Sequence, residues 1–359
     1  MSANAVTLQD AMLRHQVLVQ RLSSAEVAKF KPFLRQIDRA IRDALTDETI
    51  TQMAKYRLEQ LLNAVDALLI GIMNRFTQQL LLDLETYADH EAKFTAASLD
   101  AASTFDAIIP SPTQIRSAIL STPLSVKGRG RGSLLKPWLD QWTQGEIRAV
   151  NGALRRGAFE GKTNASMIRE LRGSHDRNYQ NGVIDLTRRN AEAVVRTAVQ
   201  HVASVAREET YKANADIISI EQWLSTLDKR TCPSCRALDG KEFARGKGPK
   251  TPLHVNCRCI RIPVLKEEYA YLAEGETRAS KGAKGGAQVA ADLSYYEWLK
   301  GQPAWFQDQA IGPVRGALLR KGGLSAEDFA RLSVDKYYAP LTLDEMRAIE
   351  PAAFKRAGL

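Results

Sequence analysis

Apolar residues recur at helical spacing over most of the first hundred residues. The runs comprise Phe30, Phe33, Leu34, Ile37, Ile41 and Leu45, then Leu58, Leu61, Leu62, Val65, Leu68 and Leu69, then Met73, Phe76, Leu80 and Leu81. Residues three and four apart share one face of an α-helix, so these runs predict long amphipathic helices in an antiparallel bundle or hairpin. Thr7 with Asp10, and Ser23 with Glu26, have capping-box spacing and predict helix starts. We interpret the apolar faces as a self-packed core rather than as a docking surface for a partner.

The helical pattern breaks between residues 101 and 136, where prolines interrupt any helix, and then resumes. Residues 137–175 predict two helices, with a cap at Thr143. Residues 186–215 predict the clearest helix of the chain, with a stripe of valines on one face. His201 lies beside that stripe, and we interpret it as a core or surface histidine rather than as a ligand or a base.

The pattern loosens again after Val264. Residues 274–291 are rich in glycine and alanine without an apolar period, and predict a flexible linker. An aromatic cluster follows, made of Tyr295, Tyr296, Trp298, Trp305 and Phe306. Capping boxes at Ser325 and Thr342 predict further helices. We expect this end of the chain to form either a small self-packed helical domain or an arm that lies on a neighbouring protein.

All four cysteines of the chain lie in one segment, together with a histidine. Cys232 and Cys235 are separated by two residues, and His254, Cys257 and Cys259 follow further along. Cysteines with this separation can turn both sulfurs toward one point, and thiolate sulfur with imidazole nitrogen is the ligand set that zinc prefers. The segment therefore offers five candidate ligands for a tetrahedral site that needs four. A site closed by four protein ligands is structural rather than catalytic.

Other interpretations of these cysteines remain open. Two disulfides are compatible with four cysteines, but a long chain gains little from them and no secretory signal is visible. A redox pair at Cys232 and Cys235 leaves the second cluster unexplained. Four free thiols are the simplest alternative. We expect a metal, with Cys232, Cys235 and Cys257 as the most secure ligands.

Short β-strands are predicted on both sides of the candidate ligands. Residues 218–223 and 260–264 show partial alternation of apolar and polar positions, and Asp239–Gly240 is a hairpin turn signal. So small a module buries little apolar surface, and a metal cross-link would supply the missing stability.

These patterns together predict a mainly α protein, with a helical N-terminal bundle, a small α+β metal-binding module and a helical C-terminal tail. The expected regions are 1–135 for the helical N-terminal part, 136–215 for the helical central part, 216–265 for the zinc-binding-like module, 266–292 for the flexible linker and 293–359 for the tail. No run approaches twenty apolar residues, so no membrane span is predicted.

The charge balance adds a candidate partner. The 359 residues carry a formal net charge of +9, which favours an acidic partner such as DNA, although a basic protein without DNA contact is the alternative. The residues that we expect to neutralise phosphates without reading sequence are Lys127, Arg129 and Arg131 in a glycine-punctuated loop, with Arg155 and Arg156 in the following helix. A solvated linker is the alternative for that loop.

Two stretches carry a family resemblance. The stretch from Trp223 to Gly240, with the first cysteine pair, and the stretch from Pro252 to Cys259 resemble the signature of the phage head-morphogenesis family. These are minor head proteins similar to protein F of phage Mu. The preceding helix, with Arg196, Thr197, Glu209, Ala213 and Asn214, resembles the helix before that signature, so that the likeness covers about residues 140–265. One departure is that many members have a proline beside the histidine, where this chain has Leu253 and Val255.

The resemblance implies a structural virion protein without enzymatic activity, at or near the portal vertex during procapsid assembly and DNA packaging. It implies portal protein and other capsid proteins as partners, and a protein that leaves the head with the genome. The basic patches favour a non-specific contact with packaged DNA. Because no leader is visible, we expect synthesis in the host cytoplasm. The competing class is a zinc-dependent nuclease, although no His-Glu-x-x-His helix is present. Three ligands plus water beside Asp228 or Glu242 would favour catalysis, whereas four protein ligands would favour structure.

Overall fold

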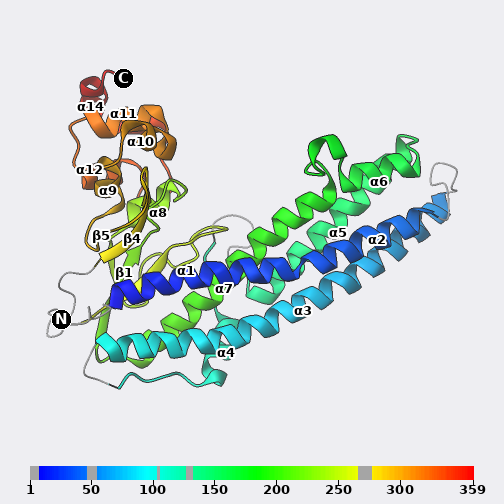
Figure 1. Ribbon diagram of the computed structural model, residues 1–359, viewed down its shortest axis with the longest axis horizontal. Coiled ribbons are helices and arrows are strands. Elements are labelled where there is room, and N and C mark those ends of the chain that lie inside the picture. The colour runs from blue at the N-terminus through cyan, green and yellow to red at the C-terminus, as the bar shows by residue number, and fades with distance from the viewer. Residues whose placement is uncertain (1–7, 47–54, 103–105, 127–131, 266–276) are drawn as a thin grey trace.

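The computed structural model describes residues 8–46, 55–102, 106–126, 132–265 and 277–359. Most of the described chain is helical, and long helices lie side by side in an elongated bundle (Figure 1). The bundle consists of α1 Leu8–Lys29, α2 Lys31–Thr46, α3 Lys55–Ala102, α4 Pro112–Ser121, α5 Leu135–Phe159, α6 Asn164–Arg172 and α7 Val183–Ala213. None of the helices in the described ranges has the length and apolarity that a membrane crossing needs. The predominance of helices in the described residues confirms the mainly α fold that the apolar periodicity predicts.

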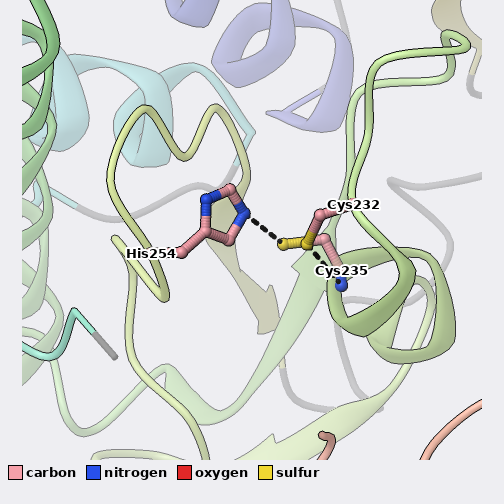
Figure 2. A group of neighbouring side chains, drawn as sticks. All are labelled: Cys232, Cys235 and His254. Atoms are coloured by element: carbon pink, nitrogen blue, oxygen red, sulfur yellow. Dashed lines mark hydrogen bonds between the residues drawn. The ribbon is translucent and has the colours of Figure 1, made fainter. Parts of the chain in front are cut away.

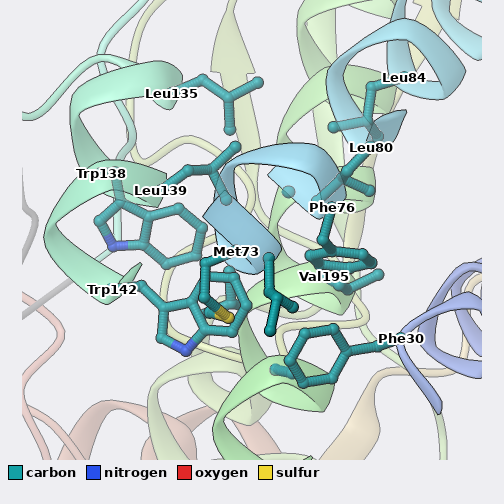
Figure 3. Close-up of a cluster of buried hydrophobic side chains, with 14 of the residues drawn as sticks. Phe30, Met73, Phe76, Leu80, Leu84, Leu135, Trp138, Leu139, Trp142 and Val195 are labelled. Carbon is teal, nitrogen blue, oxygen red and sulfur yellow. The ribbon is translucent and has the colours of Figure 1, made fainter. Parts of the chain in front are cut away.

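The predicted apolar faces meet inside this bundle. Phe30 packs against Phe76 and Trp142, with ring centroids 4.6 and 5.7 Å apart (Figure 3). Leu34, Ile37, Ile41 and Leu45 of α2 are all buried. The apolar period thus predicted the buried face, since side chains three and four apart face the same neighbouring helices.

Two of the predicted helix starts are wrong. Ser23 lies inside α1, where its hydroxyl donates to the Val19 carbonyl at 2.9 Å. Thr143 lies inside α5, and its presumed capping partner Glu146 instead accepts hydrogen bonds from Thr187. Both helices continue because the hydroxyl of a serine or threonine is tolerated within a helix when packing on either side is favourable. Thr7 lies outside the described residues.

His201 is a buried core histidine, only 2% exposed, on the face of α7 that packs into the bundle. Burial lowers the pKa of its imidazole to about 4, although a backbone contact with Thr122 acts in the opposite direction. A histidine whose pKa is lowered by folding stabilises the fold fully above its unfolded pKa of about 6.5, and this contribution is lost as the pH falls toward 4.

We therefore expect His201→Leu to remove part of the acid sensitivity of the protein. Between pH 7.5 and 5, protonation of His201 is expected to lower the free energy of unfolding of the wild type by about 2 kcal/mol. The variant lacks this loss. The free energy of unfolding of the wild type, measured in urea relative to that of the variant, should therefore fall by that amount between pH 7.5 and pH 5. A difference that does not change with pH would contradict the assignment.

A three-stranded antiparallel sheet follows the bundle. β1 Ile218–Leu224 lies in the centre, between β2 Glu242–Ala244 and β3 Ile260–Leu265, and the short helix α8 Pro233–Leu238 follows β1. In this register Gln222 pairs with Glu242 on one side and with Ile262 on the other. The two predicted strands are confirmed. The turn at Asp239–Gly240 joins α8 to β2 rather than two paired strands, and Gly240 supplies the positive φ of 81° that this turn requires.

The prediction of a flexible linker is wrong for residues 277–290. They form a hairpin of β4 Thr277–Gly282 and β5 Gly285–Ala290. Arg278 is 1% exposed and its guanidinium lies 3.0 Å from the Asp239 carboxylate. A buried ion pair between residues this far apart leaves no local sequence pattern, so the sequence alone predicts a linker here. Residues 266–276 lie outside the described part of the chain.

The C-terminal residues form a compact helical domain with its own core. Its helices are α9 Tyr295–Lys300, α10 Ala304–Ile311, α11 Pro313–Lys321, α12 Ala326–Leu332, α13 Leu343–Ile349 and α14 Pro351–Ala357. Phe329 and Phe354 are buried at its centre, and the predicted caps at Ser325 and Thr342 are present. The Tyr295 hydroxyl donates to the Asp228 carbonyl at 2.8 Å. Of the two predicted arrangements, the described residues adopt the self-packed one, and this domain docks on the sheet module.

Candidate metal centre

The structure brings the five predicted ligands together between α8 and the loop that leads into β3. Their donor atoms form two groups, Cys232 with Cys235 and His254, and Cys235 with Cys257 and Cys259. Within each group the donor atoms all lie within 4.8 Å of one another. The two groups share Cys235, whose buried sulfur faces the His254 ring (Figure 2).

The first cysteine pair is positioned by the start of α8. Cys232 is the N-cap residue of this helix, and its sulfur accepts a hydrogen bond from the Cys235 backbone amide at 3.4 Å. Pro233 occupies the first turn, where its missing amide hydrogen costs nothing. The Cys-Pro-Ser-Cys sequence therefore folds as a helix start that presents both sulfurs on one side.

The second cluster is positioned by α7. The Thr197 hydroxyl accepts from the Asn256 amide at 3.0 Å, and the Gln200 side chain donates to the Cys259 carbonyl at 3.0 Å. The hydroxyls of Ser204 and Thr251 lie 2.6 Å apart at the start of the same loop. One face of the longest central helix thus fixes the loop that carries His254 and the last two cysteines.

The donor atoms fit a tetrahedral zinc ion. Zinc–ligand bonds of about 2.3 Å to sulfur and 2.0 Å to nitrogen place two sulfurs about 3.8 Å apart, and a sulfur and a nitrogen about 3.6 Å apart. The Cys235 sulfur lies 3.9 Å from the Cys257 sulfur and 3.4 Å from His254 Nε2. His254 Nδ1 lies 2.8 Å from the Val255 carbonyl oxygen, to which it donates, and this leaves the lone pair of Nε2 facing the sulfurs.

Cys259 differs from the other four candidates in its hydrogen bonding. Its thiol donates to the Ser225 hydroxyl at 3.5 Å. Ser225 in turn donates to the Cys235 carbonyl at 2.7 Å and accepts from the Trp223 indole at 3.1 Å. This contact distinguishes Cys259 from Cys232, Cys235, His254 and Cys257, although its sulfur also lies within 4.8 Å of the sulfurs of Cys235 and Cys257.

The electrostatics of the cluster differ from one candidate ligand to the next. The hydrogen bond with the Cys235 thiol lowers the pKa of Cys232 to about 4, and the neighbouring imidazole adds to this effect. Hydrogen bonds with neighbouring sulfurs lower the pKa of Cys257 and raise the pKa of Cys235. For His254 burial acts to lower the pKa, but hydrogen bonds to the sulfurs of Cys232 and Cys257 prevail and raise it to about 11. Thiolate and neutral imidazole are the forms that bind a metal, so Cys232 and Cys257 are ready for a cation, whereas Cys235 and His254 would each release a proton on binding it.

The two carboxylates next to the cluster are not placed as catalytic bases. The Asp228 oxygens lie 2.6 and 2.8 Å from the Arg258 guanidinium, and one of them also accepts from the Arg230 amide at 2.9 Å. Burial acts to raise the pKa of Asp228, but the hydrogen bonds and charge of Arg258 lower it. Glu242 is exposed on β2. Asp228 therefore organises the loop before Cys232.

The predicted phosphate-binding residues are separate from this centre. Lys127, Arg129 and Arg131 lie outside the described residues. Arg155 makes two hydrogen bonds to Glu59 at 2.6 and 2.9 Å, so its guanidinium is used within the bundle. The Arg156 side chain is 61% exposed and lies 3.8 Å from Glu170. Phosphate contact by these five residues stays a prediction.

Comparison with known proteins identifies the segment that holds the centre. Residues 148–262, which contain all five candidate ligands, match the family described as Phage Mu protein F like protein. The chain is also 28% identical over 156 residues to the NAD(+)--arginine ADP-ribosyltransferase EFV of Enterococcus faecalis (strain ATCC 700802 / V583), and this match covers 39% of the chain but only 29% of that protein. No solved structure matches significantly. The predicted resemblance to this family is therefore confirmed over residues 148–262.

Proposed function

We propose that the protein is a structural component of phage head morphogenesis that acts at the portal vertex and catalyses no reaction. The observation that carries the proposal is that the family segment contains both the ligand cluster and the helix that supports it. Residues 148–262 hold α7, the sheet and the ligand cluster, and α7 is hydrogen-bonded to the ligand-bearing loop. The match to this family supports portal protein and other capsid proteins as the partners.

We propose zinc as the ion, held by Cys232, Cys235, His254 and Cys257. Bound zinc would supply a cross-link between α8 and the loop before β3. The module needs such a link, because its core consists mainly of Trp223, Leu238 and Leu253 with the cysteines themselves. The role that follows is to keep a small module rigid while its outer surface contacts a partner.

A zinc-dependent enzyme that acts on nucleic acid is the alternative. It would need an open coordination position and a base near it. The candidate donors form two groups of three that share Cys235, which offers more than three protein ligands, and both oxygens of Asp228 are engaged by Arg258, so these observations support the structural role. The similar Enterococcus faecalis protein is named a transferase, but the chain spans about 29% of its length, and that activity is not extended to this chain.

Contact with packaged DNA is a further part of the proposal. It is supported by the net charge of +9, and it would be independent of sequence. Binding of this kind weakens steeply as salt increases, because each neutralised phosphate releases counterions.

We expect purified particles of the phage that encodes the chain to contain it in few copies, together with the portal protein. Quantitative mass spectrometry of procapsids and mature virions measures both proteins against the major capsid protein. Particles from a phage with the gene disrupted provide the control and should package little DNA. Detection of the chain only in the soluble lysate, with normal packaging after disruption, would contradict the proposal.

A further inference from the structure

A pocket of about 730 Å³ lies where α1, α7 and the metal-binding loop meet. Among the described residues, five arginines line it, namely Arg21, Arg189, Arg196, Arg230 and Arg258. The only carboxylate among its lining residues is Glu192. The arginines come from four separate segments of the chain, and the fold gathers them on one concave surface.

Two of these guanidinium groups keep free donors, whereas Arg189, Arg196 and Arg258 are paired with carboxylates. No ion pair or hydrogen bond of the Arg21 side chain is found among the described residues, and this side chain is exposed. The Arg230 side chain is 74% exposed, and within the described part of the chain its only ion pair is a 3.5 Å contact with Asp228. Asp228 is already held by Arg258 at 2.6 Å, so Arg230 is only partly neutralised. An arginine with free donors is suited to bind phosphate oxygens through its planar fork.

The basic surface continues into a second pocket of about 440 Å³ beside the C-terminal domain. Arg230 lines both pockets, and the second one adds Lys229 and Lys281. It also contains Trp305, whose side chain is 54% exposed. The cations therefore form a continuous line, here called the arginine track, from Arg21 through Arg230 to Lys281.

We propose that the arginine track binds the phosphodiester backbone of DNA. The assignment rests on the DNA contact proposed above and names the surface that makes it. Regularly spaced phosphates suit a line of guanidinium and ammonium groups, which contact the backbone without reading its sequence. The exposed Trp305 at the end of the track offers a face on which an unpaired base can stack, which an acidic polypeptide would not use.

The test compares Arg21→Ala/Arg230→Ala with the control Lys31→Ala/Arg35→Ala, which removes the same charge from exposed positions on α2. Fluorescence anisotropy with a labelled duplex of about 20 base pairs measures the Kd of the full-length proteins at several salt concentrations. The track variant is expected to bind about tenfold more weakly at 0.1 M salt, with a salt slope smaller by about 2, whereas the control should change by less than about twofold. Unchanged thermal unfolding shows that each variant is folded.

The outcomes separate the two proposals. Failure of the wild type to bind DNA would overturn both the DNA contact and the track. Binding by the wild type with equal losses in both variants, or with no loss in the track variant, would overturn the track alone. Displacement of the duplex by polyglutamate as effectively as by unlabelled DNA would assign the track to an acidic polypeptide instead.

Discussion

Replacing Cys235 with serine is expected to release the metal and to lower the free energy of unfolding by about 4 kcal/mol or more. Cys235 is fully buried and belongs to both groups of donor atoms, so its loss breaks both groups. Metal content by plasma mass spectrometry and unfolding in urea, both on the full-length protein, measure the two effects. A variant that keeps its metal would show that the cluster is not the binding site.

Cys259→Ser is the matched control for this prediction. Cys259 is buried like Cys235 and Cys257, but its thiol donates to the Ser225 hydroxyl, and the set proposed here does not include it. We expect this variant to keep about one equivalent of metal and to lose less stability than Cys235→Ser. Equal metal loss in both variants would place Cys259 among the ligands, in contradiction to the set proposed here.

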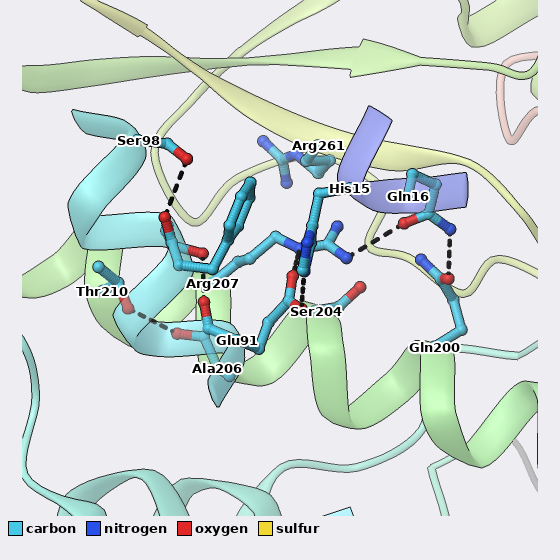
Figure 4. Close-up of polar contacts among 12 residues, drawn as sticks. His15, Gln16, Glu91, Ser98, Gln200, Ser204, Ala206, Arg207, Thr210 and Arg261 are labelled. Carbon is cyan, nitrogen blue, oxygen red and sulfur yellow. Dashed lines mark hydrogen bonds and ion pairs between the residues drawn. The ribbon is translucent and has the colours of Figure 1, made fainter. Parts of the chain in front are cut away.

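Replacing Glu91 with alanine is expected to lower the free energy of unfolding by about 3 to 5 kcal/mol, although Glu91 is not a candidate metal ligand. The carboxylate is fully buried and lies 2.5 Å from the Arg207 guanidinium and 2.6 Å from the His15 ring (Figure 4). It also accepts a hydrogen bond from the Tyr87 hydroxyl at 2.7 Å. Removing it leaves the buried Arg207 charge without its counterion. This network joins α1, α3 and α7, so its loss weakens the bundle that supports the metal-binding loop.

The control for Glu91 is an exposed ion pair. Asp140→Ala breaks the contact of Asp140 with Lys136 on the surface of α5 and should change stability by no more than about 0.5 kcal/mol. Urea-induced unfolding measures both variants. Similar values for the two would contradict the importance assigned to the buried network.

The same network predicts a sensitivity to acid. Burial acts to raise the pKa of Glu91, but the charge of Arg207 and the contact with His15 lower it to about 2. A carboxylate with a lowered pKa stabilises the fold fully above its unfolded pKa of about 4.3, and that contribution is lost as the pH falls toward 2. Glu91→Ala should lack this part of the acid dependence.

The sequence predicted those features that depend on neighbours in the chain. The spacing of the cysteines within each cluster predicted metal ligands, and the structure places their donor atoms in two adjoining groups that share Cys235. The apolar period from Phe30 to Leu45 predicted the buried face of α2, because that face is set by the geometry of the helix itself. Capping patterns predicted helix starts less well, because Ser23 and Thr143 lie inside helices that continue on both sides of them.

Features made by distant residues had no such pattern. The pair of Arg278 and Asp239 turns a glycine-rich stretch into an ordered hairpin, and it forms only when the chain has folded. The arginine track is similar, because Arg21 and Arg230 are separated by most of the bundle in the sequence and meet only in the structure. Thr197 and Gln200, which hold the metal-binding loop, are ordinary polar residues on a helix face. Only the family resemblance pointed to Thr197.

X-ray absorption at the zinc edge of the purified full-length protein tests the central claim most directly. The proposed ligand set predicts about one zinc per chain, with three sulfurs at about 2.3 Å and one nitrogen at about 2.0 Å. Protein isolated without metal, or a zinc ion with fewer than three sulfurs and a bound water, would contradict a closed structural site.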